Sequence, residues 1–132
     1  MDIVIDFDGT CVTHEYPAIG REIGATSVLR DLADAGHRLI LFTIRCNEKK
    51  KNNHTLDDAV EWFRERDIPL FGIQVHPEQQ QWTSSPKAYG DMYIDDTALG
   101  CPLIIPENDE RPYVDWKTIR KLLNEKGVFR NL

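Results

Sequence analysis

The sequence predicts an α/β protein, a three-layer Rossmann-like sandwich built on a parallel five-stranded sheet. Two observations carry this prediction. Short, almost unbroken apolar runs are typical of parallel strands covered on both faces, and they alternate with segments whose apolar residues recur at helical spacing. This alternation favours right-handed crossovers and helices on both faces of the sheet. Because 132 residues is an ordinary single-domain length, we expect one core domain over residues 1–132, with strand order 5-4-1-2-3.

The first three expected elements are a strand, a helix and a strand. Residues 3–7 form the first apolar run. Apolar residues in 25–33 then recur at helical spacing, and Gly36 is placed to end that helix. Residues 39–42 form the second apolar run, which ends at Thr43. This order is typical of a unit in which a helix connects two parallel strands.

A polar loop over residues 45–53 precedes the second expected helix, and it contains three consecutive lysines. Thr55 is expected to cap this helix, whose inward face lies in residues 56–63. Acidic residues in the first turn complement the helix dipole, and Pro69 stops the helix.

The second half of the chain supplies the remaining strands. Residues 71–75, 92–94 and 103–105 are the predicted third, fourth and fifth strands. Residues 76–89 are rich in Gln, Ser and Pro, which predicts a loop with at most one helical turn. The last helix is expected to begin near Asp115.

Composition narrows the classes of function. The chain has 22 acidic and 16 basic residues, and its net charge of −6 argues against a general nucleic-acid binder or a protein of anionic membranes. No apolar stretch approaches the roughly 20 residues that span a bilayer. Cys11, Cys46 and Cys101 match neither a disulfide framework nor a zinc site, so we expect a cytoplasmic protein.

Acidic and hydroxyl side chains follow three of the predicted strands. Asp6 ends the first, Thr43 follows the second, and Asp95 and Asp96 follow the fourth. Because the carboxyl ends of parallel strands meet at one edge of a sheet, we expect these side chains to converge there. Carboxylates at such an edge repel each other unless a cation is present, and Mg²⁺ prefers one or two carboxylates with water and phosphate. Asp6 and Asp95, with the main-chain carbonyl of Asp8, are expected to supply that set.

Four segments in order resemble the motifs of the haloacid dehalogenase-like (HAD) superfamily of phosphohydrolases. They are Asp6-Phe7-Asp8-Gly9-Thr10, Thr43, Lys87 and Asp95-Asp96. Together they cover most of the chain. The resemblance implies a magnesium-dependent phosphomonoester hydrolase that works through an aspartyl-phosphate.

The resemblance also implies a role for each matching residue. Asp6 is the expected nucleophile, and Asp8 is the expected general acid that later activates water. Thr10, Thr43 and Lys87 are expected to bind phosphate or substrate. A lysine there would offset the phosphoryl charge, and a hydroxyl would donate one oriented hydrogen bond.

The expected metal ligands are Asp6, Asp8, Asp95 and Asp96, with Asp96 binding directly or through water. Asp91 is an alternative candidate for the fourth motif, since Gly-Asp also occurs in the superfamily's last motif. However, it begins the strand that Asp95 follows, and at about 3.3 Å per residue it should lie on the order of 13 Å away.

Several nearby residues have open roles. Arg45 is expected to bind substrate with its planar fork. His14 and Glu15 either touch the leaving group or lie on a solvated flap. The run Lys49–Lys51 either steers an anionic substrate or is ordinary charged surface. Trp82 either stacks on a base or sugar or packs its loop onto the core.

The chain has no room for the cap domain that usually closes a HAD site. Residues 11–24 allow only a short hairpin-like flap, and residues 45–86 are used by a helix, a strand and loops. An open site favours a large phosphorylated substrate that covers the metal, or a homo-oligomer whose neighbouring subunit serves as a lid. The alternative is a poorly discriminating small-molecule phosphatase.

Two other functions remain open from the sequence. One is a non-catalytic HAD-like module that binds a phosphorylated ligand or docks a partner. The other is phosphotransfer to an acceptor other than water. The substrate is not identified, because the loops that would recognise it carry no specific motif.

Overall fold

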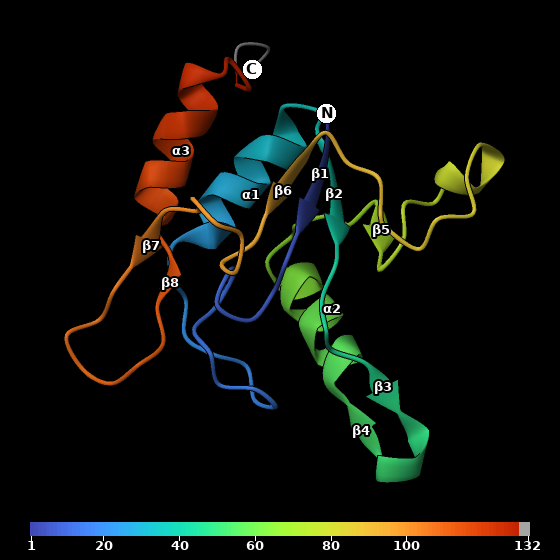
Figure 1. Ribbon diagram of the computed structural model, residues 1–132, viewed down its shortest axis with the longest axis horizontal. Coiled ribbons are helices and arrows are strands. Elements are labelled where there is room, and N and C mark those ends of the chain that lie inside the picture. The colour runs from blue at the N-terminus through green and yellow to red at the C-terminus, as the bar shows by residue number, and fades with distance from the viewer. Residues whose placement is uncertain (130–132) are drawn as a thin grey trace.

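A parallel four-stranded sheet in the order β5-β2-β1-β6 forms the centre of the protein, whose computed structural model describes residues 1–129 (Figure 1). The strands are β1 (Asp2–Ile5), β2 (Arg38–Leu41), β5 (Gly72–Ile73) and β6 (Met92–Ile94). In register, Ile5 lies between Leu41 of β2 and Ile94 of β6. The carboxyl ends of β1, β2 and β6 therefore meet at one edge, as the sequence predicts.

The fifth strand was expected in this sheet over residues 103–105, and that expectation is wrong. Residues of this segment form β7 (Leu103–Ile104), which pairs antiparallel with β8 (Tyr113–Val114) in a separate two-stranded sheet. Residues 95–102, which connect it to β6, are fewer than the dozen or so residues that a parallel crossover needs. The sheet therefore has four strands, and the order 5-4-1-2-3 lacks its first member.

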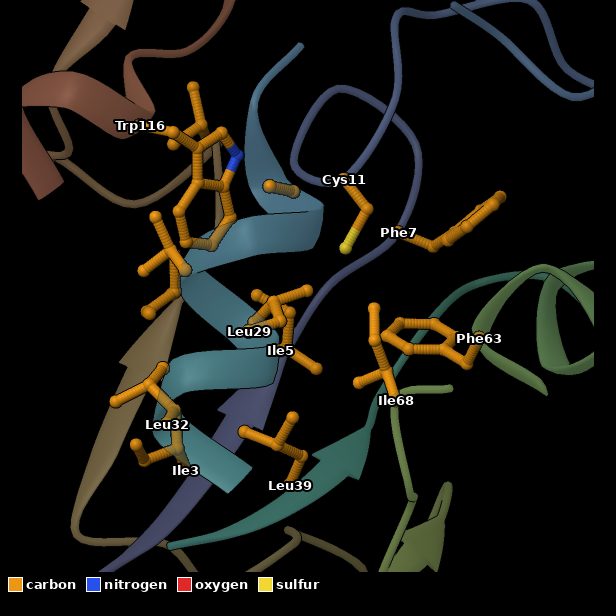
Figure 2. Packing of buried hydrophobic residues seen from close by; sticks show 14 of the residues in the cluster. Ile3, Ile5, Phe7, Cys11, Leu29, Leu32, Leu39, Phe63, Ile68 and Trp116 are labelled. Atoms are coloured by element: carbon orange, nitrogen blue, oxygen red, sulfur yellow. The ribbon is translucent and has the colours of Figure 1, made fainter. Parts of the chain in front are cut away.

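Three helices were expected and three are present in residues 1–129: α1 (Ala25–Asp34), α2 (Thr55–Glu65) and α3 (Trp116–Glu125). All contribute apolar side chains to one cluster with the same face of the sheet (Figure 2). The sheet residues of that cluster include Ile3, Ile5, Leu39 and Leu41. The main core thus lies between the sheet and one helical layer.

Within residues 1–129, no α-helix covers the other face of the sheet, so the expected three-layer arrangement is not found there. Val4 and Ile40 on that face pack instead with Ala88, Phe42 and Phe71. The segment between β5 and β6 was predicted as loop with at most one turn, and it contains the single turn η2 (Gln79–Gln81). Its prolines and serines favour turns over an amphipathic helix.

The polar loop before α2 is more ordered than expected. β3 (Asn47–Glu48) and β4 (Asn53–His54) pair antiparallel around the turn η1 (Lys49–Lys51), and this hairpin projects from the body of the protein (Figure 1). Thr55 is not the cap of α2 but its first residue, and its hydroxyl donates to the carbonyl of Cys46. The hairpin thus places the start of α2 beside the end of the β2 loop.

A short flap follows β1, as the sequence predicts. Val12 bridges antiparallel to Glu22, the Thr13 amide donates to the Arg21 carbonyl, and the Arg21 amide donates to the Thr13 hydroxyl. The three cysteines are free thiols. Over residues 1–129, none of the helices has the length and apolar character that crossing a bilayer would take.

Candidate active site

A cleft of about 640 Å³ lies at the edge of the sheet where β1, β2 and β6 end. Its lining residues are Asp6, Asp8, His14, Tyr16, Phe42, Thr43, Ile44, Asp95, Asp96, Thr97 and Arg111. They come from segments that are far apart in sequence and that meet because the strands are parallel and adjacent. Five of the residues expected at the site are among them: Asp6, Asp8, Thr43, Asp95 and Asp96.

Three of these carboxylates are close enough to share one cation. Asp6, Asp95 and Asp96 each offer an oxygen, and these oxygens all lie within 4.8 Å of one another. Asp95 is oriented by Thr97, whose amide and hydroxyl both donate to its Oδ1 at 2.8 and 2.7 Å. Clustered carboxylate oxygens at an open edge are the donor set that Mg²⁺ prefers.

The electrostatics of Asp6 fit the same interpretation. The pKa of Asp6 is raised to about 8, mainly by burial, with smaller upward contributions from the carboxyl groups of Asp96 and Asp95, while the hydrogen bond from Thr10 lowers it. A divalent cation beside these oxygens would favour the ionised form of Asp6 and relieve the repulsion. The residues present therefore fit a magnesium ion.

Thr10 was expected to bind phosphate or substrate, but its position does not allow this. The side chain is fully buried, and its hydroxyl lies 2.8 Å from Asp6 Oδ2 and 3.2 Å from Asp96 Oδ1. The same oxygen accepts a hydrogen bond from the Asp96 amide. Thr10 thus joins the loop after β1 to the loop after β6 and positions two of the carboxylates.

Arg45 was expected to reach the substrate, and this expectation is also wrong. Its side chain has no exposed surface, and Nε and Nη2 donate to the two carboxylate oxygens of Asp8, both at 2.8 Å. Nη2 also donates to the carbonyl of Ala18, and Nη1 donates to the carbonyls of Pro17 and Thr55. A guanidinium has five N–H groups, and all five contacts are made within the protein.

Asp8 consequently differs from the other aspartates of the cleft. Its carboxylate is held by Arg45 rather than grouped with Asp6, Asp95 and Asp96, so its side chain is not part of that cluster of carboxylates. It still lines the cleft. A bidentate contact uses one lone pair of each oxygen, which leaves the second free for a proton.

Thr43 lines the cleft with a hydroxyl that is able to donate. Its Oγ1 accepts from the amide of Arg45 at 3.1 Å, so its own proton is available to a ligand. Gln74 fixes this loop: its Oε1 accepts from the Thr43 amide, and its Nε2 donates to the carbonyls of Thr43 and Arg45. The loop after β2 is therefore held in one conformation beside the carboxylates.

Lys87 is not brought together with the other expected phosphate-binding residues. Its side chain is exposed, it does not line the cleft, and its Nζ lies 5.7 Å from the centre of the Tyr93 ring. The buried side chain of Gln79 donates to the carbonyls of Ser85 and Lys87 and accepts from the amide of Tyr89. These bonds hold the segment along the other face of the sheet.

His14 lies in the cleft beside Asp96, whereas the sequence alone left open whether it belongs to the site. Its Nε2 lies 2.8 Å from Asp96 Oδ2. Gly9 has a positive φ of 79°, and a Cβ there would lie 2.0 Å from His14 Nε2 and 2.5 Å from Asp96 Oδ2. Only glycine therefore fits this turn. Glu15, in contrast, is exposed.

Arg111, Tyr16 and Ile44 line the cleft but were missed from the sequence. Arg111 comes from the loop between β7 and β8, and no ion pair holds it among residues 1–129. Arg45 is used internally and Lys87 lies elsewhere, so Arg111 is a cation of the cleft that a ligand can reach. No motif marks any of these residues, because their loops meet the site only in the folded chain.

Asp91 lies at the opposite end of the sheet, as expected. Its Oδ2 accepts from the amide of Asp2, at the start of β1. Asp2 in turn is bonded by Arg38 and His76. This acidic and basic cluster is separated from the cleft by the length of β1.

Comparisons with known proteins identify a related solved structure but give no activity. The sequence matches no protein-family model, and no curated protein is similar to it. A solved structure, that of a conserved protein from Bacteroides thetaiotaomicron, is similar to this chain with a TM-score of 0.73. The two are 38% identical over 96% of this chain and 91% of the other. The chain therefore belongs to the same family as this conserved Bacteroides protein.

Proposed function

We propose that the protein is a magnesium-dependent phosphomonoester hydrolase of the HAD type, with Asp6 as the nucleophile. The observation that carries this proposal is the convergence of Asp6, Asp8, Asp95 and Asp96 in one cleft at the carboxyl edge of the sheet. The resemblance of the four sequence motifs supports the same activity.

Asp6, Asp95 and Asp96 are the residues that would hold the metal. When bound, Mg²⁺ would neutralise charge on the phosphate and on the carboxylates around it. His14 and Thr10 hold Asp96 from two sides, so this ligand needs little reorganisation. Fixed ligands of this kind favour binding because less conformational entropy is lost.

The chemistry proceeds in two displacements. A carboxylate oxygen of Asp6 attacks phosphorus while the bond to the leaving oxygen breaks, and Asp8 gives that oxygen a proton. Water then attacks the phosphorus of the aspartyl-phosphate, Asp8 takes a proton from that water, and the Asp6 carboxylate is released with inorganic phosphate. Arg45 holds Asp8 in place for both proton transfers.

Two other groups of the cleft would bind the phosphoryl oxygens. The Thr43 hydroxyl has a free proton to donate, and Arg111 supplies a positive charge. Charge-assisted donors of this kind stabilise the charge of the transferring phosphoryl group. We propose that Arg111 takes part of the role that the family pattern gives to Lys87.

The position of Lys87 favours a second candidate function. A lysine that the resemblance assigns to phosphate lies outside the cleft, next to Tyr93. This arrangement is compatible with a non-catalytic HAD-like module that binds a phosphorylated ligand at the acidic site. Against this candidate, a module that only binds has no need of Asp8 as a proton donor.

A phosphatase assay with a matched pair of variants tests the proposal. The wild-type protein should release phosphate from a panel of phosphomonoesters with Mg²⁺, and EDTA should stop the release. Asp6→Asn should lower kcat by roughly a thousandfold or more, because the nucleophile is lost. Asp91→Asn makes the same chemical change at the far end of the sheet and should retain turnover.

Wild-type turnover by Asp6→Asn would show that no aspartyl-phosphate forms on Asp6. Absence of turnover across the panel, with magnesium-dependent binding of a phosphorylated compound, would support the non-catalytic module.

A further inference from the structure

Two large apolar side chains of the cleft are presented to solvent. Ile44 is 93% exposed and Tyr16 is 56% exposed, and both line the cleft that contains the carboxylates. Single exposed apolar side chains are common on protein surfaces. Here the two lie on separate segments that border the same acidic site, so their exposure needs an explanation.

The exposure of Ile44 does not come from a loose loop. Its neighbours Thr43 and Arg45 are tied by the side chain of Gln74, and the Arg45 amide donates to the Thr43 hydroxyl. The Arg45 side chain is buried and fully bonded. A rigid backbone therefore presents an isoleucine side chain to the cleft.

Tyr16 is fixed from the other side of the cleft. The Arg45 guanidinium lies 5.2 Å from the centre of its ring, and the next two residues, Pro17 and Ala18, accept hydrogen bonds from the same group. A cation over an aromatic face is attractive, and Arg45 is itself held by Asp8. The flap thus holds a ring at the entrance to the site with part of its surface free.

The side chains of Tyr16 and Ile44 favour one chemical class of leaving group. A leaving group that consists of a sugar or glycerol alone would place its hydroxyls against the Tyr16 ring and the Ile44 side chain, which offer few hydrogen-bond partners. A planar ring would bury apolar surface on both and stack on an aromatic face. The phosphate would remain at the carboxylates, with Thr43 and Arg111 beside it.

We propose, on the basis of the proposed function, that the substrate is a phosphomonoester whose leaving group carries an aromatic ring. Tyr16 and Ile44 bind that ring and determine specificity. Two sources share this chemistry, a nucleoside monophosphate and an aryl phosphate such as phosphotyrosine.

The experiment compares pairs of substrates with and without an aromatic ring. Adenosine 5′-monophosphate and ribose 5-phosphate have the same primary phosphoester, so their ratio of kcat/KM measures the effect of the base. Phosphotyrosine and phosphoserine form the second arm, in which the phenol is also the better leaving group, so the variants below separate ring binding from intrinsic reactivity. The wild-type protein should favour the ring by roughly tenfold in at least one arm, and that arm identifies the source.

Variants of Tyr16 and Ile44 then test whether these residues cause the preference for ring-containing substrates. Tyr16→Leu and Ile44→Ala should each lower kcat/KM for the preferred ring substrate by roughly fivefold or more and leave its ring-free counterpart within about twofold. Tyr16→Phe keeps the ring and should keep the preference. Ile105→Ala removes another isoleucine, which is 78% exposed outside the cleft, and should change neither value.

The outcomes separate the two proposals. Turnover with no ring preference in either arm, or a preference that survives both Tyr16→Leu and Ile44→Ala, overturns the ring-binding inference and leaves the hydrolase intact. No turnover of any compound contradicts the proposed function. Calorimetric binding of the same pairs with Mg²⁺ then decides the inference: equal affinity for ring and ring-free compounds would overturn it.

Discussion

Arg45 joins Asp8, the proposed proton donor, to two other parts of the chain. Its guanidinium bonds Asp8, the flap carbonyls of Pro17 and Ala18, and the carbonyl of Thr55 at the start of α2. Removing it would leave a partly buried carboxylate and three carbonyls without their donor. Removing one partner of a buried ion pair strongly destabilises the folded protein, because the remaining charge is desolvated and unpaired.

We therefore predict that Arg45→Met lowers the free energy of unfolding by about 3 kcal/mol. It should also lower kcat, since Asp8 loses its fixed position. Urea denaturation followed by circular dichroism measures the first effect. Arg64→Met is the matched control, because Arg64 pairs with Glu61 on the exposed surface of α2 and should change stability little. Equal stability of Arg45→Met and wild type would contradict the role given to Arg45.

Sequence reasoning located the acidic residues of the site but not the residues that hold them. Asp6, Thr43 and Asp95 were predictable because each follows an apolar strand, and parallel strands end at one edge. Thr10 and Arg45 were misassigned because a hydroxyl or guanidinium near a motif is equally able to face the ligand or the protein. Their acceptors become neighbours only in the folded chain.

At the scale of elements, periodicity predicted the helices but not their distribution over the sheet. The apolar faces of α1, α2 and α3 were each visible at helical spacing. Which face of the sheet a helix covers depends on crossovers and on whether the other face has its own cover. The segment between β5 and β6 was correctly predicted as mostly loop, which already conflicted with a second helical layer.

Asp115 illustrates an element whose boundary was predictable. It is the N-cap of α3, where its side chain accepts from the amide and the hydroxyl of Thr118. We predict that Asp115→Ala lowers the free energy of unfolding by about 1 kcal/mol, because the first turn of α3 loses its acceptor. Thermal unfolding measures this. Asp109→Ala, in the exposed loop between β7 and β8, is the control, and a similar loss there would contradict a specific capping effect.

At the scale of the whole molecule, the acidic cleft is expected to link the free energy of unfolding to pH and, on the proposed function, to magnesium. Asp6 has a pKa of about 8 in the folded protein, against an ordinary value of 3.8, mainly because it is buried. The folded chain thus binds this proton more tightly than the unfolded chain does. The contribution of Asp6 to the free energy of unfolding is fully present below about pH 4 and is lost as the pH rises toward 8.

We predict that, without magnesium, stability declines over this window by up to about 1.4 kcal/mol per pH unit from Asp6. Mg²⁺ should stabilise the protein more at pH 8 than at pH 5, since a cation binds the ionised carboxylates. Urea titrations at several pH values, with Mg²⁺ or EDTA, measure both effects. Asp6→Asn should remove the decline that Asp6 causes, and a magnesium effect that does not change with pH would argue against these ligands.

The central position of β1 has a consequence for how the protein acquires its activity. Asp6 follows β1, whose neighbours β2 and β6 are separated from it in sequence by the helix α1 and by most of the remaining chain. Pairing of β1 with β2 forms half of the cleft, and the acidic pair arrives only when β6 docks on the opposite side of β1. A partly folded chain in which β6 is not docked is not expected to bind the metal, so metal affinity during refolding reports the docking of β6 on β1.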